Sequence, residues 1–187
     1  MRGTPALILA LVLLALPASA AAAEFTHEGL PIEETTAVAL TGTNFGFVTG
    51  DGSGINCPDV EVELDLLPGG VGEITTFDTA TYCTVIGVGL LTHMEPIDIH
   101  DWTAEADPEN KRIVLGNVHL TNTITVGGQV AAENTFEGHE IWLNVDSNAP
   151  ISTAELDNPA GGMTFNGANV DFGAVFHVLN GTEIGQE

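Results

Sequence analysis

The chain has 187 residues, with 26 Asp and Glu against three Lys and Arg, and a formal charge of −23. Nucleic acids and anionic membranes are bound through clustered basic residues, so this balance excludes both as electrostatic partners. Solubility is the simplest explanation of the acidity, with a high-salt habitat and divalent-cation binding as alternatives.

The first 23 residues follow the order of a secretory signal peptide. Arg2 precedes an apolar run over 6–16, and small residues suited to cleavage follow. The run is too short to span a bilayer as a stable anchor. We therefore expect residues 1–23 to be removed, the protein to be secreted or extracytoplasmic, and no membrane insertion after cleavage. A mobile segment is expected over 24–34 and a single β domain over 35–187.

A strand–turn–strand unit over residues 57–79 is the clearest local pattern. Apolar residues at 60, 62, 64 and 66 alternate with acids at 61, 63 and 65, which is the period of a half-buried strand. Pro68 and Gly69 then predict a tight turn before a second strand over 74–79.

Further strands are predicted along the rest of the chain. Residues 82–92 are apolar on both faces and predict a central strand, and 113–126 predict the longest strand. Shorter alternating runs predict strands over 97–102, 140–146 and 170–178. Together with the strand over 35–48, these give an all-β fold, an antiparallel β-sandwich of about nine strands, with a β-barrel as the alternative.

Cys57 and Cys83 are the only cysteines. Two cysteines in an exported chain usually pair, so we expect a disulfide that closes a loop of about 25 residues. A metal site would need more ligands than these two thiols supply.

From Cys57 onward the chain resembles small exported proteins common in actinobacteria. In them a cysteine-led alternating strand, a Pro-Gly turn and a second strand precede another cysteine. The likeness covers about residues 40–126 and rests on Cys57, Val60, Val62, Leu64, Pro68, Gly69, Gly72, Ile74, Thr75, Thr76, Phe77, Cys83 and Thr84. It implies export and a β-sandwich but no activity. This chain departs from the pattern in having only two cysteines and more acids.

The two tryptophans point to ligand binding. Trp102 and Trp142 both fall on the polar side of their predicted strands, near Asp98, His100 and Glu140. An exposed indole beside carboxylates can hold a sugar, with the apolar ring face on the indole and the hydroxyls on the acids. The alternative is a structural role, in which each ring covers a sheet edge or packs beneath a loop.

A calcium site is the most plausible metal site. Asn144, Asp146, Asn148 and Glu155 reproduce positions 1, 3, 5 and 12 of a calcium loop. Asn144 replaces the usual first Asp, and Ala149 replaces the turn glycine. No other cofactor is expected.

The sequence contains no motif for nucleophilic catalysis. The only run near a Gly-x-Ser-x-Gly elbow, at 51–55, does not fit it, and a cysteine nucleophile conflicts with the disulfide. We therefore predict a non-enzymatic binding or structural module of the cell envelope or medium, which binds a glycan or calcium or self-associates through a sheet edge. The alternative is a secreted hydrolase that uses paired carboxylates on glycans.

Overall fold

The computed structural model describes residues 23–79, 82–138, 141–178 and 183–187, so the predicted signal peptide lies outside them except for Ala23. This part of the chain forms sixteen strands and one 3-10 helix, η1 (Ile99–Asp101). The strands are β1 (Phe25–His27), β2 (Leu30–Pro31), β3 (Thr36–Thr49), β4 (Gly54–Leu67), β5 (Val71–Asp78), β6 (Cys83–Ile86), β7 (Leu91–Pro96), β8 (Thr103–Asp107), β9 (Arg112–Gly116), β10 (His119–Val126), β11 (Gln129–Gly138), β12 (Ile141–Val145), β13 (Thr153–Asp157), β14 (Met163–Phe165), β15 (Ala168–Val178) and β16 (Ile184–Gln186). No helix within these residues is long and apolar enough to cross a membrane.

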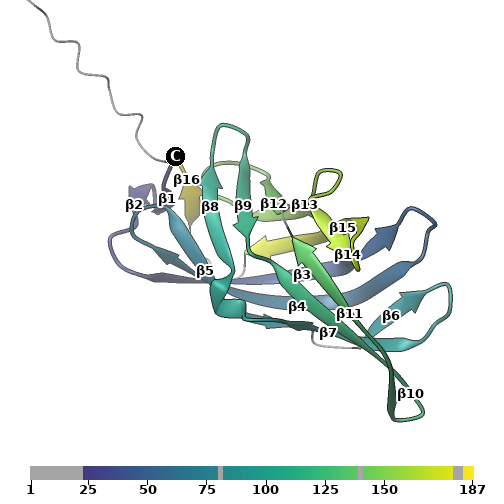
Figure 1. The fold of residues 1–187 in the computed structure, drawn as a ribbon. Helices are drawn as coiled ribbons and strands as arrows, with labels where there is room; N and C mark the ends of the chain where they lie inside the picture. The colour runs from purple at the N-terminus through teal and green to yellow at the C-terminus, as the bar shows by residue number, and fades with distance from the viewer. Residues whose placement is uncertain (1–22, 80–81, 139–140, 179–182) are drawn as a thin grey trace, which may run out of the picture.

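The strands pair antiparallel throughout, which confirms the predicted all-β, antiparallel class. Thirteen of them form one sheet in the order β13-β12-β9-β8-β5-β4-β3-β15-β14-β11-β10-β7-β6. β13 also pairs with β15, and β4 with β6, so hydrogen bonding closes two circuits that share β3, β4 and β15 (Figure 1). Both terminal strands of the large sheet therefore have a second partner, which limits the open edge available for self-association.

The long central strands β3 and β4 build the core as their alternation predicts. Val60, Val62, Leu64 and Leu66 are all buried on β4. Phe45 on β3 packs edge-on against Phe77 and Phe172, at ring-centroid distances of 5.2 and 5.0 Å. Further along β3, Phe47 belongs to a second aromatic group with Phe136 and Phe165. Each group of rings lines the inside of one circuit of strands, and the shared strands supply side chains to both.

Three predicted strands are wrong. Residues 97–102 form a turn and η1 rather than a strand. Residues 82–92 form the β6–β7 hairpin rather than one central strand, because Gly87 and Gly89 adopt positive φ angles of 89° and 68° and turn the chain. Residues 113–126 are divided between β9 and β10 at Asn117, which has a φ of 56°. These breaks, together with short strands that carry little periodicity, raise the number of strands in the described residues well above nine.

The segment over 24–34, expected to be mobile, is instead part of a small sheet. β1 pairs with both β16 and β2, and Phe25 is buried. The backbone of Glu24 also exchanges hydrogen bonds with that of Glu187. Three residues of strand are too few to show a period in the sequence, so the pairing could not be seen there.

Candidate functional site

A polar face on β9, β12 and β13 carries the more accessible of the two tryptophans. Trp142 on β12 lies between Val114 on β9 and Asp157 on β13. Asn144, two residues further, lies between Arg112 and Glu155. Since side chains two apart point to the same side of a strand, these six residues share one side of the sheet. All six are partly or fully exposed, and we call this surface the Trp142 face.

Arg112 is the organising residue of the Trp142 face. Its guanidinium carbon lies 4.3 Å from the centroid of the Trp142 ring, a cation–π contact. Its Nε donates to Asp107 Oδ2 at 2.7 Å, and both side chains of this ion pair are mostly covered. The hydrogen bond from Arg112 is the main reason why the pKa of Asp107 lies below its ordinary value. A fixed positive group thus lies against the indole on a strongly acidic protein.

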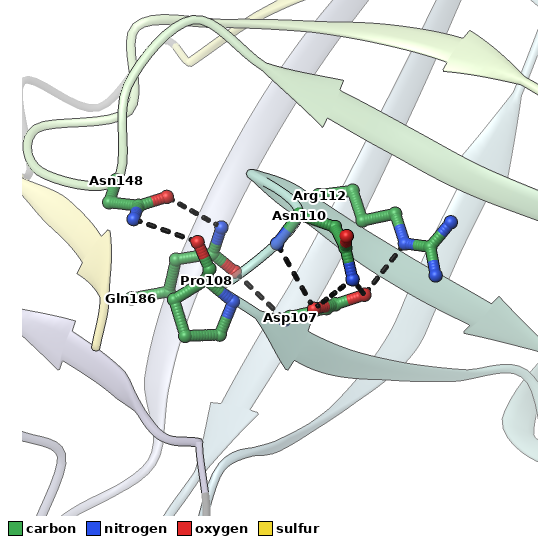
Figure 2. Close-up of polar contacts among 6 residues, drawn as sticks. All are labelled: Asp107, Pro108, Asn110, Arg112, Asn148 and Gln186. Carbon is green, nitrogen blue, oxygen red and sulfur yellow. Dashed lines mark hydrogen bonds and ion pairs between the residues drawn. The ribbon is translucent and has the colours of Figure 1, made fainter.

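Asp107 is held from its other side by the turn between β8 and β9 and by the C-terminal strand (Figure 2). Asn110 donates to the Asp107 carboxylate through its backbone N–H and its side-chain amide. The backbone N–H of Asp107 donates to Oε1 of the buried Gln186, at 3.1 Å. Gln186 Nε2 donates to Asn148 Oδ1 at 3.2 Å, and the Asn148 amide donates to Pro108 O. This network fixes Asp107, and through it the position of Arg112.

Trp102 is not on the polar face predicted for it. It is only 4% exposed, and its Nε1–H donates to the Ile97 carbonyl at 3.3 Å. The ring packs against Phe77 and lines an apolar cavity of about 40 Å³, whose other walls come mainly from β3, β4, β5, β12 and β15. Because the cavity has no polar lining and room for only a few atoms, Trp102 is a core residue and cannot stack on a sugar from solvent.

The other residues expected beside the tryptophans are separated from them. Asp98 and His100 lie around η1, where Asp98 has a φ of 46°, so they occupy a turn rather than one face of a strand. Both are exposed. Glu140 lies outside the described residues. The predicted cluster of Asp98, His100 and Trp102 is therefore wrong as a surface.

The four residues of the predicted calcium loop have other partners. Asn144 and Glu155 are cross-strand neighbours, and the Asn144 amide donates to Asp157 Oδ2 at 3.3 Å. Asp146 Oδ1 accepts from the backbone N–H groups of Ser147, Ser152 and Thr153. Burial raises the pKa of Asp146, but these bonds outweigh it and lower the pKa overall.

The Asn148 side chain belongs to the network around Gln186, where its Nδ2 donates to Pro108 O and its Oδ1 accepts from Gln186. Within the described part of the chain, no group of three His, Cys, Asp or Glu side chains is placed to hold a metal ion.

Sequence reasoning missed Arg112 and Asp157 as site residues. A signal for the first was present, because Lys111 and Arg112 are the only basic residues after the predicted signal peptide. The acids carried none, since 26 are spread along the chain and only strand register shows which of them meet.

Comparison with protein families, with curated proteins and with solved structures finds no match. The interpretation of the Trp142 face therefore rests on its own geometry.

Proposed function

We propose that this protein is a non-enzymatic, exported binding module and that it holds a neutral glycan at the Trp142 face. One observation carries the proposal: a partly exposed indole, stacked with a fixed guanidinium, lies beside a hydrogen-bonded amide–carboxylate pair on one side of a sheet. The Cys57–Cys83 disulfide is compatible with an extracytoplasmic site of action.

Each group has a role that suits a sugar. The part of the Trp142 indole left uncovered by Arg112 offers an apolar surface to C–H groups of a pyranose ring. The Arg112 guanidinium has five N–H donors, of which Nε–H goes to Asp107, so its terminal N–H groups can donate to sugar hydroxyls. Asp157 and Asn144 supply acceptors and a donor for further hydroxyls. A neutral glycan is favoured because a formal charge of −23 repels polyanionic ones.

The test is binding of the purified exported chain to an array of neutral and acidic glycans, followed by calorimetric titration of each hit. Trp142→Ala is expected to weaken binding at least tenfold, and Arg112→Gln is expected to weaken it as well. Val48→Ala, which shortens an exposed side chain on β3 away from the Trp142 face, is the matched control and should bind as wild type does. Equal binding by Trp142→Ala and wild type, or binding of acidic glycans only, would overturn the proposal.

The hydrolase alternative has less support. A glycosidase needs one carboxyl group with a raised pKa to act as general acid. The described carboxyl groups with a clear shift are all lowered: Asp51, whose pKa falls to about 2 mainly through hydrogen bonds from Ser53 and Thr49, Asp107 and Asp146. Chromatography of each bound glycan after long incubation separates the two, because a hydrolase releases shorter sugars and a binding module does not.

Calcium is tested on the same samples. After chelation, the melting temperature is measured with millimolar CaCl₂ and with NaCl of matched ionic strength. A ligand that binds only the folded protein raises stability by about 2.7 kcal/mol at a hundredfold excess over its Kd. A saturable rise with CaCl₂ alone would assign a cation-binding role to some of the acids, whereas an equal rise with both salts would show simple screening.

A further inference from the structure

Two hairpin turns lie side by side at one end of the molecule. β7 pairs with β10, with Thr92 opposite Ile124, so the β6–β7 turn and the β10–β11 turn lie at the same end of these strands. Figure 1 shows the β10–β11 hairpin projecting there, with β6 next to it. Gly87, Gly89, Gly127 and Gly128 adopt positive φ angles in the two turns, which makes both turns tight and narrow. We call the two turns together the hairpin tips.

The hairpin tips gather most of the exposed large apolar side chains of the described chain. Val88 is 66% exposed, Val130 65% and Leu91 56%. The complete set is Tyr82, Ile86, Val88, Leu90, Leu91, Val126 and Val130. Other exposed apolar residues, such as Leu30 and Val175, lie on strands away from these turns. Exposed large apolar side chains gathered in this way mark an interaction site in a soluble protein.

The tips also lack charge, on a chain that is otherwise strongly acidic. Residues 79–92 and 122–132 contain no Asp, Glu, Lys or Arg, although the chain has 26 acids. The two turns consist of Gly, Val and Leu, and Gln129 is the polar residue next to them. Uncharged runs also occur over 35–50 and 158–170, so these two turns are set apart by the combination of absent charge and gathered, exposed large apolar side chains.

We propose that the hairpin tips bind the surface of a lipid bilayer with electrically neutral headgroups. Side chains on two narrow, adjacent turns can enter the headgroup region and meet acyl chains without a complementary surface on the other side. Tyr82, exposed at the base of the tips beside His93, suits the polar–apolar boundary where tyrosine is enriched. The acidic body would be repelled by anionic lipids, so the bilayer is neutral.

A protein partner fits the same surface less well. A stable interface buries about 800 Å² and roughly 20–30 residues on each side. The hairpin tips and the adjoining strands offer seven large apolar side chains, of which Val88 and Leu90 lie in a turn. A glycan is also a poor occupant, because these side chains bring few hydrogen-bonding groups beyond the Tyr82 hydroxyl. This surface is separate from the Trp142 face, and either could act without the other.

The experiment is co-sedimentation of the purified exported chain with phosphatidylcholine vesicles, and with vesicles in which phosphatidylglycerol replaces a third of the lipid. Wild type is expected to bind the first and to bind the second more weakly at low salt, with added NaCl reducing the difference. A Val88→Asp, Val126→Asp double variant should lose at least tenfold in the bound-to-free ratio. The control is Leu30→Asp. Leu30 is as exposed as Val88 but lies on β2, so this variant should bind vesicles as wild type does.

A second variant distinguishes a loss of membrane binding from a loss of folding. Val88→Trp adds an interfacial aromatic residue at a fully solvated turn and is expected to increase binding severalfold, which a merely structural role for Val88 would not produce. The proposal is overturned if wild type does not sediment with phosphatidylcholine, or if the double variant binds as well as wild type with an unchanged melting temperature. It is also overturned if size-exclusion chromatography shows wild type as a dimer and the double variant as a monomer. The tips would then contact a second copy of the chain.

Discussion

At the scale of single residues, Arg112 connects the Trp142 ring to the Asp107 carboxylate. On one side its guanidinium covers part of the Trp142 ring, and on the other its Nε is bound by Asp107. Asn110 donates a hydrogen bond to the Asp107 carboxylate, and the backbone N–H of Asp107 donates to Gln186. The indole is thus positioned by a chain of contacts that reaches into the small sheet at the termini.

Asp107→Asn is expected to lower the free energy of unfolding by about 1–2 kcal/mol at pH 7, because it removes a charge-assisted hydrogen bond to Arg112. The folded pKa of Asp107 is depressed, so its contribution is present above the unfolded value of about 3.9 and is lost as pH falls through the folded value. Chemical denaturation from pH 7 to pH 3 should therefore show wild type and variant converging. A difference that stays constant with pH would contradict this, and Glu109→Gln in the same turn is the control.

Asn122 on β10 is buried, and only one of its two side-chain polar atoms has a hydrogen-bond partner among the described residues. Its amide donates to Thr92 Oγ1 at 3.2 Å, whereas its Oδ1 has no hydrogen-bond partner among the described residues. We expect Asn122→Val to raise the free energy of unfolding by about 1 kcal/mol, since it removes a desolvated acceptor and suits a strand. Asn122→Asp, nearly equal in volume, should lower it by about 3 kcal/mol because it buries a charge. Denaturant midpoints measure both, and a stability loss in the valine variant would show that the amide is needed.

At the scale of elements, the disulfide joins two strands of the circuit that contains β6, and one of them, β4, belongs to both circuits. Cys57 on β4 and Cys83 on β6 are bonded and fully buried, and β4 also pairs directly with β6. The bond therefore holds β6 against a strand that belongs to both circuits.

Replacing both cysteines by alanine is expected to cost about 3–4 kcal/mol, the chain-entropy value for a loop of roughly 25 residues. Urea denaturation of the double variant and of wild type gives the difference. A cost below 1 kcal/mol would mean that the reduced chain keeps the β4–β6 pairing without the bond.

Local periodicity predicted some elements well and others poorly. β4 was correct because its alternation extends over many residues and ends in Pro68-Gly69, where Gly69 has a φ of 92°. The β6–β7 hairpin was misread because a run that is apolar on both faces fits a buried strand as well as an exposed apolar turn. No local pattern in the sequence indicates that this turn faces solvent.

The candidate site shows the same limit. Trp142 could be placed on an outer face from parity alone, but Trp102 could not, because the strand predicted around it is interrupted by η1. The meeting of Arg112, Asn144 and Asp157 depends on the register of three strands, which a single sequence does not specify.

At the scale of the whole molecule, the protein carries two chemically distinct exposed surfaces on a closed, acidic body. The Trp142 face lies on β9, β12 and β13, whereas the hairpin tips extend from β6, β7, β10 and β11. Since the two surfaces use different strands, variants in one are expected to leave binding at the other unchanged.

The most direct test of the glycan proposal is a two-dimensional proton–nitrogen NMR titration with a hit from the glycan array. The chain has two tryptophans, so its side chains give two indole signals, which Trp142→Phe assigns. We predict that the Trp142 signal shifts with a saturable dependence on glycan, and that the buried Trp102 signal, bonded to Ile97, stays in place. Binding with no shift at Trp142, or with the larger shift at Trp102, would contradict the assignment of the Trp142 face.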